Sequence, residues 1–232
     1  MLWLSTWGQV LKKSNLLDHH DLNIADIRKE YRHTHIDETI VGDDPILFFS
    51  KWFTEAHKAE IEDVNAMTFC TVDAANKPHA RIVLLKGLDE KGFVFFTNYN
   101  SAKGKELHSN PHAAIVFYWK ELERQVRIEG TIEKVSAQES DDYFQSRPKG
   151  SKLGAWSSPQ SDTITDRSIL DKNHKHYEDK FKEGQIPRPE YWGGYRLIPQ
   201  TIEFWQGRAN RLHDRILFTN DGNNWAKSRL AP

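Results

Sequence analysis

From residue 67 onward the chain is dominated by short apolar segments that follow one another directly, with turn residues rather than helices between them. Several of these segments alternate apolar and polar residues, which is the period of a half-buried β-strand. Parallel strands need a long crossover connection, usually a helix, so adjoining strands favour an antiparallel sheet. We therefore expect a mainly β (α+β) fold with peripheral helices, built on a closed or split antiparallel barrel. The expected strands are 67–72, 79–86, 93–98, 113–119, 124–135, 191–199, 201–207, 213–219 and 224–230, with a β-meander formed by the first three and a turn at Asp221 and Gly222 joining the last two.

Capping residues and helical periodicity predict the helices. Asp44 followed by Pro45 is typical of an N-cap and a first helical position, and an apolar stripe follows them. Ser136 and Glu139 have the spacing of a capping box, which predicts a helix that ends at Pro148. Further helices are expected over 21–34, over 101–110 after a cap at Asn100 or Ser101, and over 166–183, with a loop over 149–161.

Composition narrows the class of protein. Lysine plus arginine (32) and aspartate plus glutamate (33) nearly cancel, so no general basic field attracts nucleic acid or an acidic membrane. No apolar run approaches the roughly 20 residues of a membrane span, and the N-terminal stretch lacks the order of a secretory signal. Cys70 is the single cysteine, which excludes an internal disulfide and fits a reducing compartment. We expect a cytoplasmic protein with a disordered segment over 1–20 and one domain over 21–232.

Metal and dinucleotide sites are not expected. The paired histidines at 19–20, 33/35 and 174/176 lack the geometry of metal ligands, because side chains two residues apart diverge on a helix. Gly193-Gly194 is interpreted as a turn, since no GxGxxG pattern follows a strand.

Two groups of polar residues lie near the predicted central strands. Arg81 and Lys86 bracket four aliphatic residues, and a buried cation is costly unless it meets an anion. The alternative is that both charges reach water from the strand ends. Thr97, Ser101 and Lys103 lie where a strand leads into a helix N-terminus, which favours a phosphate. The alternative is ordinary capping beside solvated lysines.

A third group is Tyr143, Arg147 and Ser151, spaced at intervals of four. The first two share a helix face and the third can curl back from the predicted loop, so a phenol, a guanidinium and a hydroxyl could hold a phosphate. The alternative is a surface helix end with a hydrogen-bonded tyrosine.

The fourth group is Arg211, His213 and Arg215, which would share one face of a regular strand. Two permanent cations beside a titratable imidazole indicate an anion. The alternative is a salt-bridge cluster with Asp214 and Glu203.

Together, RIVLLK, FFTN with SxK after it, ERQVRIEG, YFxSRPxxSxxGAWxSxQS, EFWQG, RLHDR and the terminal RLAP resemble the pyridoxine/pyridoxamine 5'-phosphate oxidases, in order from about residue 21 to Pro232. The resemblance implies an FMN-binding split β-barrel that works as a homodimer, with FMN at the subunit interface and both chains building each site. It also implies oxidation of pyridoxamine 5'-phosphate and pyridoxine 5'-phosphate to pyridoxal 5'-phosphate, in vitamin B6 biosynthesis and salvage. Hydride would pass to FMN, O2 would reoxidise the flavin to give H2O2, and the amine substrate would release ammonia.

The same resemblance implies the roles of individual residues. Arg211 and His213 would lie over the substrate ring as the catalytic pair. Ala102 departs from the family, which commonly has a basic residue there, so FMN phosphate binding would be weaker or Lys105 would substitute. The residues implied for FMN are Arg81, Ile82, Val83, Leu84, Leu85, Lys86, Phe96, Thr97, Ser101, Lys103, Gln125, Gln160, Ser161, Trp205 and Arg215. Those implied for the substrate are Arg28, Tyr31, Lys86, Tyr143, Arg147, Ser151, Arg211 and His213.

The sequence leaves two alternatives to an oxidase open. One is a non-catalytic split-barrel protein that binds FMN or a B6 phosphate, which need not keep Arg211 and His213. The other is an NAD(P)H-dependent flavin reductase. Peroxide production from pyridoxamine 5'-phosphate without NADPH would argue against the reductase.

Overall fold

The computed structural model describes residues 29–31, 34–222 and 224–232. Arg28, the predicted disordered segment 1–20 and most of the predicted helix 21–34 lie outside the described residues. Where residues of that predicted helix are described, at 29–31 and 34, they are not helical, so the prediction is wrong for them. Tyr31 instead packs edge-on against Trp205 and His213. This tertiary contact overrides the local periodicity.

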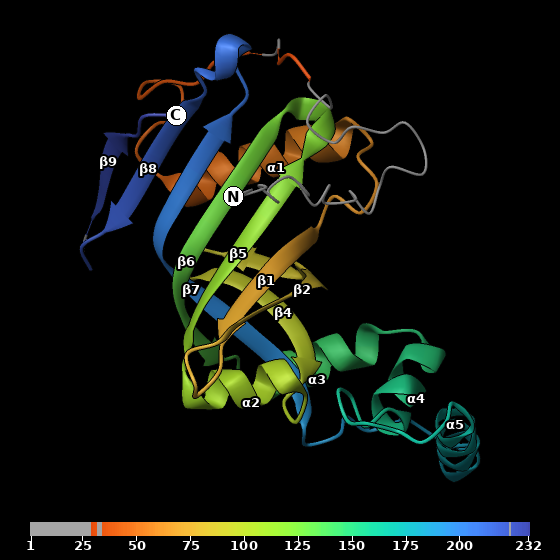
Figure 1. The fold of residues 1–232 in the computed structure, drawn as a ribbon. Coiled ribbons are helices and arrows are strands. Elements are labelled where there is room, and N and C mark those ends of the chain that lie inside the picture. The colour runs from red at the N-terminus through yellow and green to blue at the C-terminus, as the bar shows by residue number, and fades with distance from the viewer. Residues whose placement is uncertain (1–28, 32–33, 223) are drawn as a thin grey trace, which may run out of the picture.

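The centre of the molecule is a curled, antiparallel, nine-stranded sheet (Figure 1). Along it the strands have the order β2-β1-β5-β6-β7-β4-β3, and β8 and β9 extend the sheet from β7. The predicted fold class, an antiparallel sheet with peripheral helices, is confirmed. The strands are β1 Ala66–Val72, β2 Pro78–Leu84, β3 Gly87–Asp89, β4 Gly92–Asn98, β5 His112–Trp119, β6 Arg124–Lys134, β7 Trp192–Gln206, β8 Asp214–Asn220 and β9 Trp225–Arg229.

Strand β7 is shared between two parts of the sheet. Its first half pairs with β4 and its second half pairs with β8, while β6 runs along its other edge. The sequence predicted two strands here, but β7 is continuous. A register shift between Glu129 and Gly130 of β6 lies opposite Pro199, so the proline is accommodated without ending the strand. A Cβ on Gly130 would lie 2.0 Å from the carbonyl oxygen of Ile198, so this close approach requires glycine.

The predicted β-meander is wrong. Within the described sheet β2 pairs with β1, whereas β4 pairs with β3 and β7. The sequence also missed β3, where a turn was expected, because three residues are too few to show a period. The predicted hairpin at Asp221 and Gly222 is confirmed, since β8 pairs with β9.

The capping signals are confirmed. Asp44 accepts hydrogen bonds from the amides of Ile46 and Leu47, Ser101 caps the helix after β4, and Ser136 accepts from the amide of Glu139. The α-helices are α1 Pro45–Lys58, α2 Ala102–Ser109, α3 Ala137–Ser146, α4 Lys149–Ser157 and α5 Ser168–Lys180, with short 3-10 helices η3 at Lys120–Leu122 and η4 at Ala209–Arg211.

Helix α4 corrects the predicted loop over 149–161. Its glycines and serines have low helix propensity, but Leu153 is buried beside Phe144, Ile186 and Trp192. This packing stabilises a helix that its sequence does not favour locally.

The apolar core has two parts. The larger part packs α1 against the sheet, with Phe49 and Trp52 buried among the aromatic residues Phe117 and Phe204. The smaller part, around Trp192, lies between the start of β7 and helices α3 and α4. Helices α2 to α5 therefore gather at one end of the sheet, and β8 and β9 lie at the other (Figure 1).

Candidate active site

A buried lysine lies where β4 leads into α2. The side chain of Lys103 is only slightly exposed, and its Nζ donates to Thr97 Oγ1 and Ser101 Oγ, each at 3.3 Å. Burial lowers the pKa of Lys103, the nearby charge of Arg81 lowers it further, and Glu106 opposes both. Hydroxyl groups do not compensate the charge of an ammonium, so this position favours an additional anion. The three residues predicted here do come together.

Arg81 is held beside Lys103 by residues that the sequence did not reveal. Its guanidinium donates to Glu106 Oε2 at 2.9 Å and to Thr71 Oγ1, and Thr71 donates to the same carboxylate oxygen. Arg81 is therefore ion-paired, not simply a strand-end charge that reaches water. Glu106 could not be recognised from its sequence, because a glutamate on a short polar helix is ordinarily solvated.

The lysine site continues into a neighbouring pocket. Thr97 Oγ1 lies 3.4 Å from Gln160 Oε1, which follows α4. Gln160 also lines a pocket of about 280 Å³ together with Arg147, Ser151 and Trp192. Thr97 and Gln160 thus join two polar regions that are distant in sequence.

Arg147 is the most unusual cation of this pocket. It caps the C-terminus of α3, and its guanidinium carbon lies 4.5 Å from the ring centroid of Trp192. Its Nη1 is buried and makes no hydrogen bond to any residue that the structure describes. An unsatisfied buried donor costs about 1–3 kcal/mol, more when charged, and burial lowers the pKa of Arg147. The arrangement favours a bound anion.

Tyr143 and Lys86 line an adjoining pocket with Phe96. The rings of Tyr143 and Phe96 are stacked with centroids 3.8 Å apart, and burial raises the pKa of the phenol. Ser151 lies in the first turn of α4 rather than in a loop. The predicted group of Tyr143, Arg147 and Ser151 is therefore divided between two adjacent pockets that share this end of the sheet.

A second group lies where β7 and β8 pair. The His213 ring is 4.6 Å from that of Trp205 and 5.6 Å from that of Tyr31. The amide of Arg208 donates to His213 Nδ1 at 3.1 Å, which leaves Nε2 as the nitrogen that carries the proton in the neutral ring. Burial lowers the pKa of His213, and the charge of Arg211 lowers it further.

The predicted single face of Arg211, His213 and Arg215 is wrong. Arg211 belongs to η4, where its φ is 61°, and β8 begins only at Asp214. The left-handed backbone interrupts the strand before the alternation can begin. Arg215 donates to Glu203 Oε1 at 2.7 Å and to the carbonyl of Ala231 at 2.8 Å, so the salt-bridge alternative holds for this residue.

The remaining predicted cofactor residues are spread over the sheet. Gln125 pairs with Trp205 in the β6–β7 register. On β2, Ile82 and Leu84 are exposed (64% and 40%), while Val83 is partly buried and Leu85, just beyond the strand, is buried against the core. Ser161 is exposed and has a φ of 75°.

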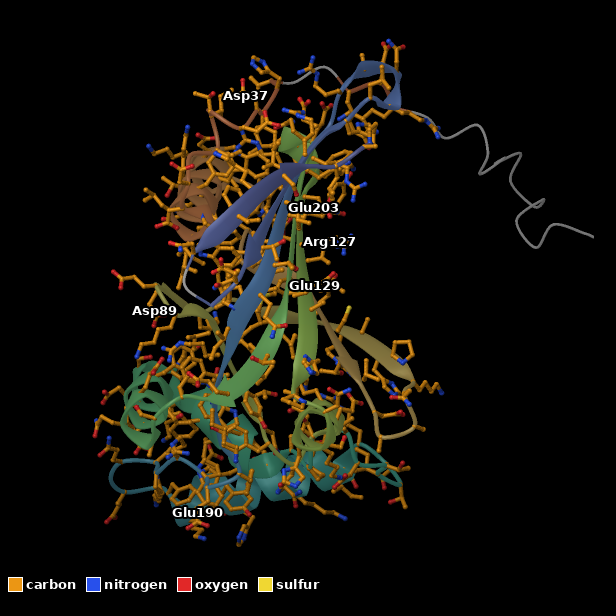
Figure 2. The ribbon with its side chains drawn as sticks, turned by 90° about the vertical axis from the view of Figure 1, so that its left-hand side faces the viewer. Asp37, Asp89, Arg127, Glu129, Glu190 and Glu203 are labelled. Carbon is orange, nitrogen blue, oxygen red and sulfur yellow. The ribbon has the colours of Figure 1, made fainter. Side chains whose placement is uncertain are left out.

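The predicted site residues therefore form two groups at opposite ends of the sheet. The end that carries α2 to α5 holds the lysine site and the Arg147 pocket, and the end with β8 holds the His213 group (Figure 1). Figure 2 shows Glu203 and Arg127 on the stretch between these ends; Arg127 contacts Glu203 at 3.3 Å. Within a single chain, the described residues of these two groups remain apart.

Comparison with known proteins decides the family. The family model described as "Pyridoxamine 5'-phosphate oxidase" matches residues 53–180, and the model of a "Pyridoxine 5'-phosphate oxidase C-terminal dimerisation region" matches residues 192–232. The chain belongs to the pyridoxamine 5'-phosphate oxidase family. The boundary between the two matches falls just before β7.

Curated relatives match almost from end to end. The "Pyridoxine/pyridoxamine 5'-phosphate oxidase" of a Cyanothece species is 54% identical over 211 residues, which are 91% of this chain and 99% of that protein. The protein of the same name from Burkholderia thailandensis is 55% identical over 212 residues, covering 90% of this chain and 99% of the relative.

Solved structures match the fold. PhzG from Burkholderia lata, in complex with tetrahydrophenazine-1-carboxylic acid, has a TM-score of 0.82 at 27% identity and covers 88% of this chain and 100% of its own. A pyridoxamine 5'-phosphate oxidase-related, FMN binding protein from Nostoc punctiforme has a TM-score of 0.65 at 17% identity, covering 82% and 100%. The split-barrel architecture expected for the family is thus confirmed.

Two kinds of feature are absent from the described ranges. These residues contain no group of His, Cys, Asp and Glu that could hold a metal ion. None of their helices has the length and apolar character needed to cross a membrane.

Proposed function

We propose that this chain oxidises pyridoxamine 5'-phosphate and pyridoxine 5'-phosphate to pyridoxal 5'-phosphate with FMN as cofactor. The observation that carries the proposal is the pair of adjoining cationic sites, one around Lys103 and one around Arg147, connected through Thr97 and Gln160. A flavin mononucleotide and a B6 vitamer each present a phosphate, so the two sites match two ligands that must lie together. The names of the curated relatives support this choice of substrate.

The Lys103 site fits the FMN phosphate. A buried ammonium with hydroxyl partners and a guanidinium alongside supplies charge-assisted donors, and the N-terminus of α2 adds a favourable dipole. Ser101 and Lys103 would bind the phosphate together with Arg81. The other residues proposed to line FMN are Ile82, Val83, Leu84, Leu85, Lys86, Phe96, Thr97, Gln125, Gln160, Ser161, Trp205 and Arg215.

The Arg147 pocket fits the substrate phosphate. The free Nη1 of Arg147 and the hydroxyl of Ser151 would donate to its oxygens, with Lys86 and Tyr143 closing the adjoining side. When bound, FMN would supply the acceptor for the hydride leaving the substrate's exocyclic carbon, with O2 as the final oxidant giving H2O2 and with ammonia released from the amine.

The His213 group would orient the reacting end of the substrate. Because the Arg208 amide occupies Nδ1, neutral His213 can donate a hydrogen bond only through Nε2. The lowered pKa of His213 keeps the ring in this neutral form at physiological pH. Arg211 and His213 would act as the catalytic pair, and Arg28 and Tyr31 would cover the substrate.

A homodimer would bring the two groups of site residues together. Each site would then combine the Lys103 and Arg147 end of one protomer with the His213 end of its partner. The exposed apolar side chains of Ile82, Leu84 and Tyr118 supply surface for such an interface. The matched C-terminal dimerisation region, residues 192–232, contains Trp205 and the whole His213–Arg215 segment, which supports this arrangement.

The proposal is tested by the absorbance spectrum of purified, FMN-loaded protein under anaerobic conditions. Pyridoxamine 5'-phosphate should bleach the flavin band without NADPH, and admitting O2 should restore it with formation of H2O2. Pyridoxamine without its phosphate is the matched control and should reduce the flavin far more slowly. A flavin that stays oxidised with the phosphorylated substrate but is reduced by NADPH would overturn the proposal in favour of a reductase.

A further inference from the structure

Arg196 is a buried cation that the proposed chemistry does not use. It lies on β7, its side chain is only 10% exposed, and its Nε makes no hydrogen bond to a described residue. Its guanidinium contacts Asp89 at 2.7 Å, Glu133 at 3.7 Å and Glu139 at 3.6 Å. The three carboxylates compensate the buried charge, whereas the unsatisfied Nε has an energetic cost.

The three carboxylates come from three different elements, and one of them, Glu139, lines the pocket that adjoins the proposed substrate-phosphate site. Asp89 lies on β3, just after Lys86, and Glu139 lies one helical turn before Tyr143 on α3. Glu139 lines the same pocket as Lys86 and Tyr143. Glu133 belongs to β6, directly opposite Arg196 in the β6–β7 register. Arg196 thus connects the two segments that supply Lys86 and Tyr143.

The carboxylate of Glu139 matters because the proposed ligand group is a phosphate dianion. A free carboxylate on the pocket wall would repel the phosphate and would also compete for the ammonium of Lys86. Arg196, on β7, lies with its Nη2 3.6 Å from Glu139 Oε1, so its positive charge compensates this carboxylate. In this way Arg196 compensates one of the two carboxylates that line this pocket; the other, Asp142, accepts a hydrogen bond from Gln138.

We propose that Arg196 is a positioning residue that sets the affinity of this pocket for the phosphate group of the substrate, without touching the substrate itself. The inference rests on the proposed function, because it assumes that Lys86 and Tyr143 bind that phosphate. It assigns to Arg196 a role in selecting phosphorylated over unphosphorylated B6 vitamers.

The first test compares Arg196→Met with the wild type in FMN-loaded protein, by equilibrium dialysis of pyridoxal 5'-phosphate and of pyridoxal. Affinity for the phosphorylated ligand should fall about tenfold, and affinity for pyridoxal should stay within about twofold. KM for pyridoxamine 5'-phosphate should rise in parallel while kcat is nearly kept. A merely structural role would weaken both ligands alike, and this outcome would overturn the inference.

The second test removes the carboxylate that Arg196 is proposed to compensate. Arg196→Met combined with Glu139→Gln should recover most of the lost phosphate affinity. The matched control combines Arg196→Met with Glu190→Gln, an exposed glutamate outside the pocket, and should recover nothing (Figure 2). Equal recovery in both double variants, or recovery in neither, would contradict the inference.

A third variant keeps the inference testable if Arg196→Met does not fold. Glu139→Gln alone should change the affinity for pyridoxal 5'-phosphate by less than about twofold, because Arg196 already compensates this carboxylate. Tightening by about fivefold or more would show that Glu139 is uncompensated and would overturn the inference. If the wild type binds pyridoxal 5'-phosphate but does not oxidise pyridoxamine 5'-phosphate, the proposed function fails while these binding comparisons remain decisive for Arg196.

Discussion

Lys103 Nζ lies 3.3 Å from Thr97 Oγ1, and Thr97 Oγ1 lies 3.4 Å from Gln160 Oε1. A single hydroxyl therefore connects the ammonium at the start of α2 with the residue that follows α4. The contact joins the proposed FMN phosphate site around Lys103 to the proposed substrate phosphate pocket around Arg147. It also makes the charge of Lys103 the natural first target for experiment.

Lys103→Met should weaken FMN binding by about a hundredfold, since charge-assisted hydrogen bonds contribute about 1.5–3 kcal/mol. Fluorescence titration of apoprotein with FMN measures this directly. Thr97→Val removes only the hydroxyl contact and should have a smaller effect. An unchanged FMN affinity in Lys103→Met would contradict the proposed phosphate site.

The lowered pKa of Lys103 predicts how FMN binding depends on pH. Without a ligand the ammonium loses its proton at a lower pH than an ordinary lysine, whereas a bound phosphate favours the charged form. FMN affinity should therefore be fully developed below the pKa of the apoprotein and should fall as the pH rises through it. The alkaline decrease should be absent from Lys103→Met. If the variant shows the same decrease, another group causes it.

Ala102→Arg should tighten FMN binding, and the gain should shrink as salt is added. Ala102 is the exposed first residue of α2, next to the proposed phosphate site. Lys105, the alternative source of the missing charge, is exposed and lies 3.8 Å from Asp162. Ala102→Gln is the matched control for side-chain length. Unchanged affinity at low salt would mean that the site already has all the charge it can use.

Arg211→Leu should lower kcat/KM for pyridoxamine 5'-phosphate by about a hundredfold while FMN content and thermal stability stay near normal. Among residues 29–31, 34–222 and 224–232, no ion pair of Arg211 is found, so its removal breaks no described salt bridge. The pKa of His213 should rise, because the charge of Arg211 lowers it, and NMR titration of the imidazole would show this. A destabilised variant with normal flavin reduction per bound FMN would refute the proposed role.

Dilution should release FMN and dissociate the dimer together, because a ligand held by two subunits stabilises their association by mass action. Analytical ultracentrifugation monitored at the flavin band follows both quantities in one experiment. Tyr118→Glu, at an exposed position of β5 that is not among the proposed FMN residues, should shift both transitions to higher protein concentration. A fully FMN-loaded monomer would contradict the proposed shared site.

Local signals in the sequence were sufficient for much of the fold. The caps at Asp44, Ser101 and Ser136 are correct because each depends on residues within three or four positions of one another. Strand pairing was not predictable in the same way. That β4 pairs with β7, about a hundred residues later, depends on long-range packing that alternation within one strand does not encode.

In the candidate site, too, local signals were recognised in the sequence and long-range contacts were not. Thr97, Ser101 and Lys103 were found because a strand and a helix start place them together. Glu106 and Arg196 were missed, because their importance comes from partners that the fold brings in from other elements. The face predicted for Arg211 failed because Asn210 and Arg211 both adopt left-handed backbone before β8 begins, and of the two only the asparagine is a residue type that favours this conformation.

Strand β7 sets the separation between the two groups of site residues within one chain. Its 15 residues, at a rise of about 3.3 Å each, give a length of roughly 50 Å measured along the strand. Trp192 at its first position contacts Arg147, and Trp205 near its last position contacts His213. A chimera that exchanges either end with a relative would have to preserve this length to the residue. Inserting a single residue into β7 would turn the side chains after the insertion to the opposite face of the sheet. The Arg147 group and the His213 group would then change their orientation relative to each other.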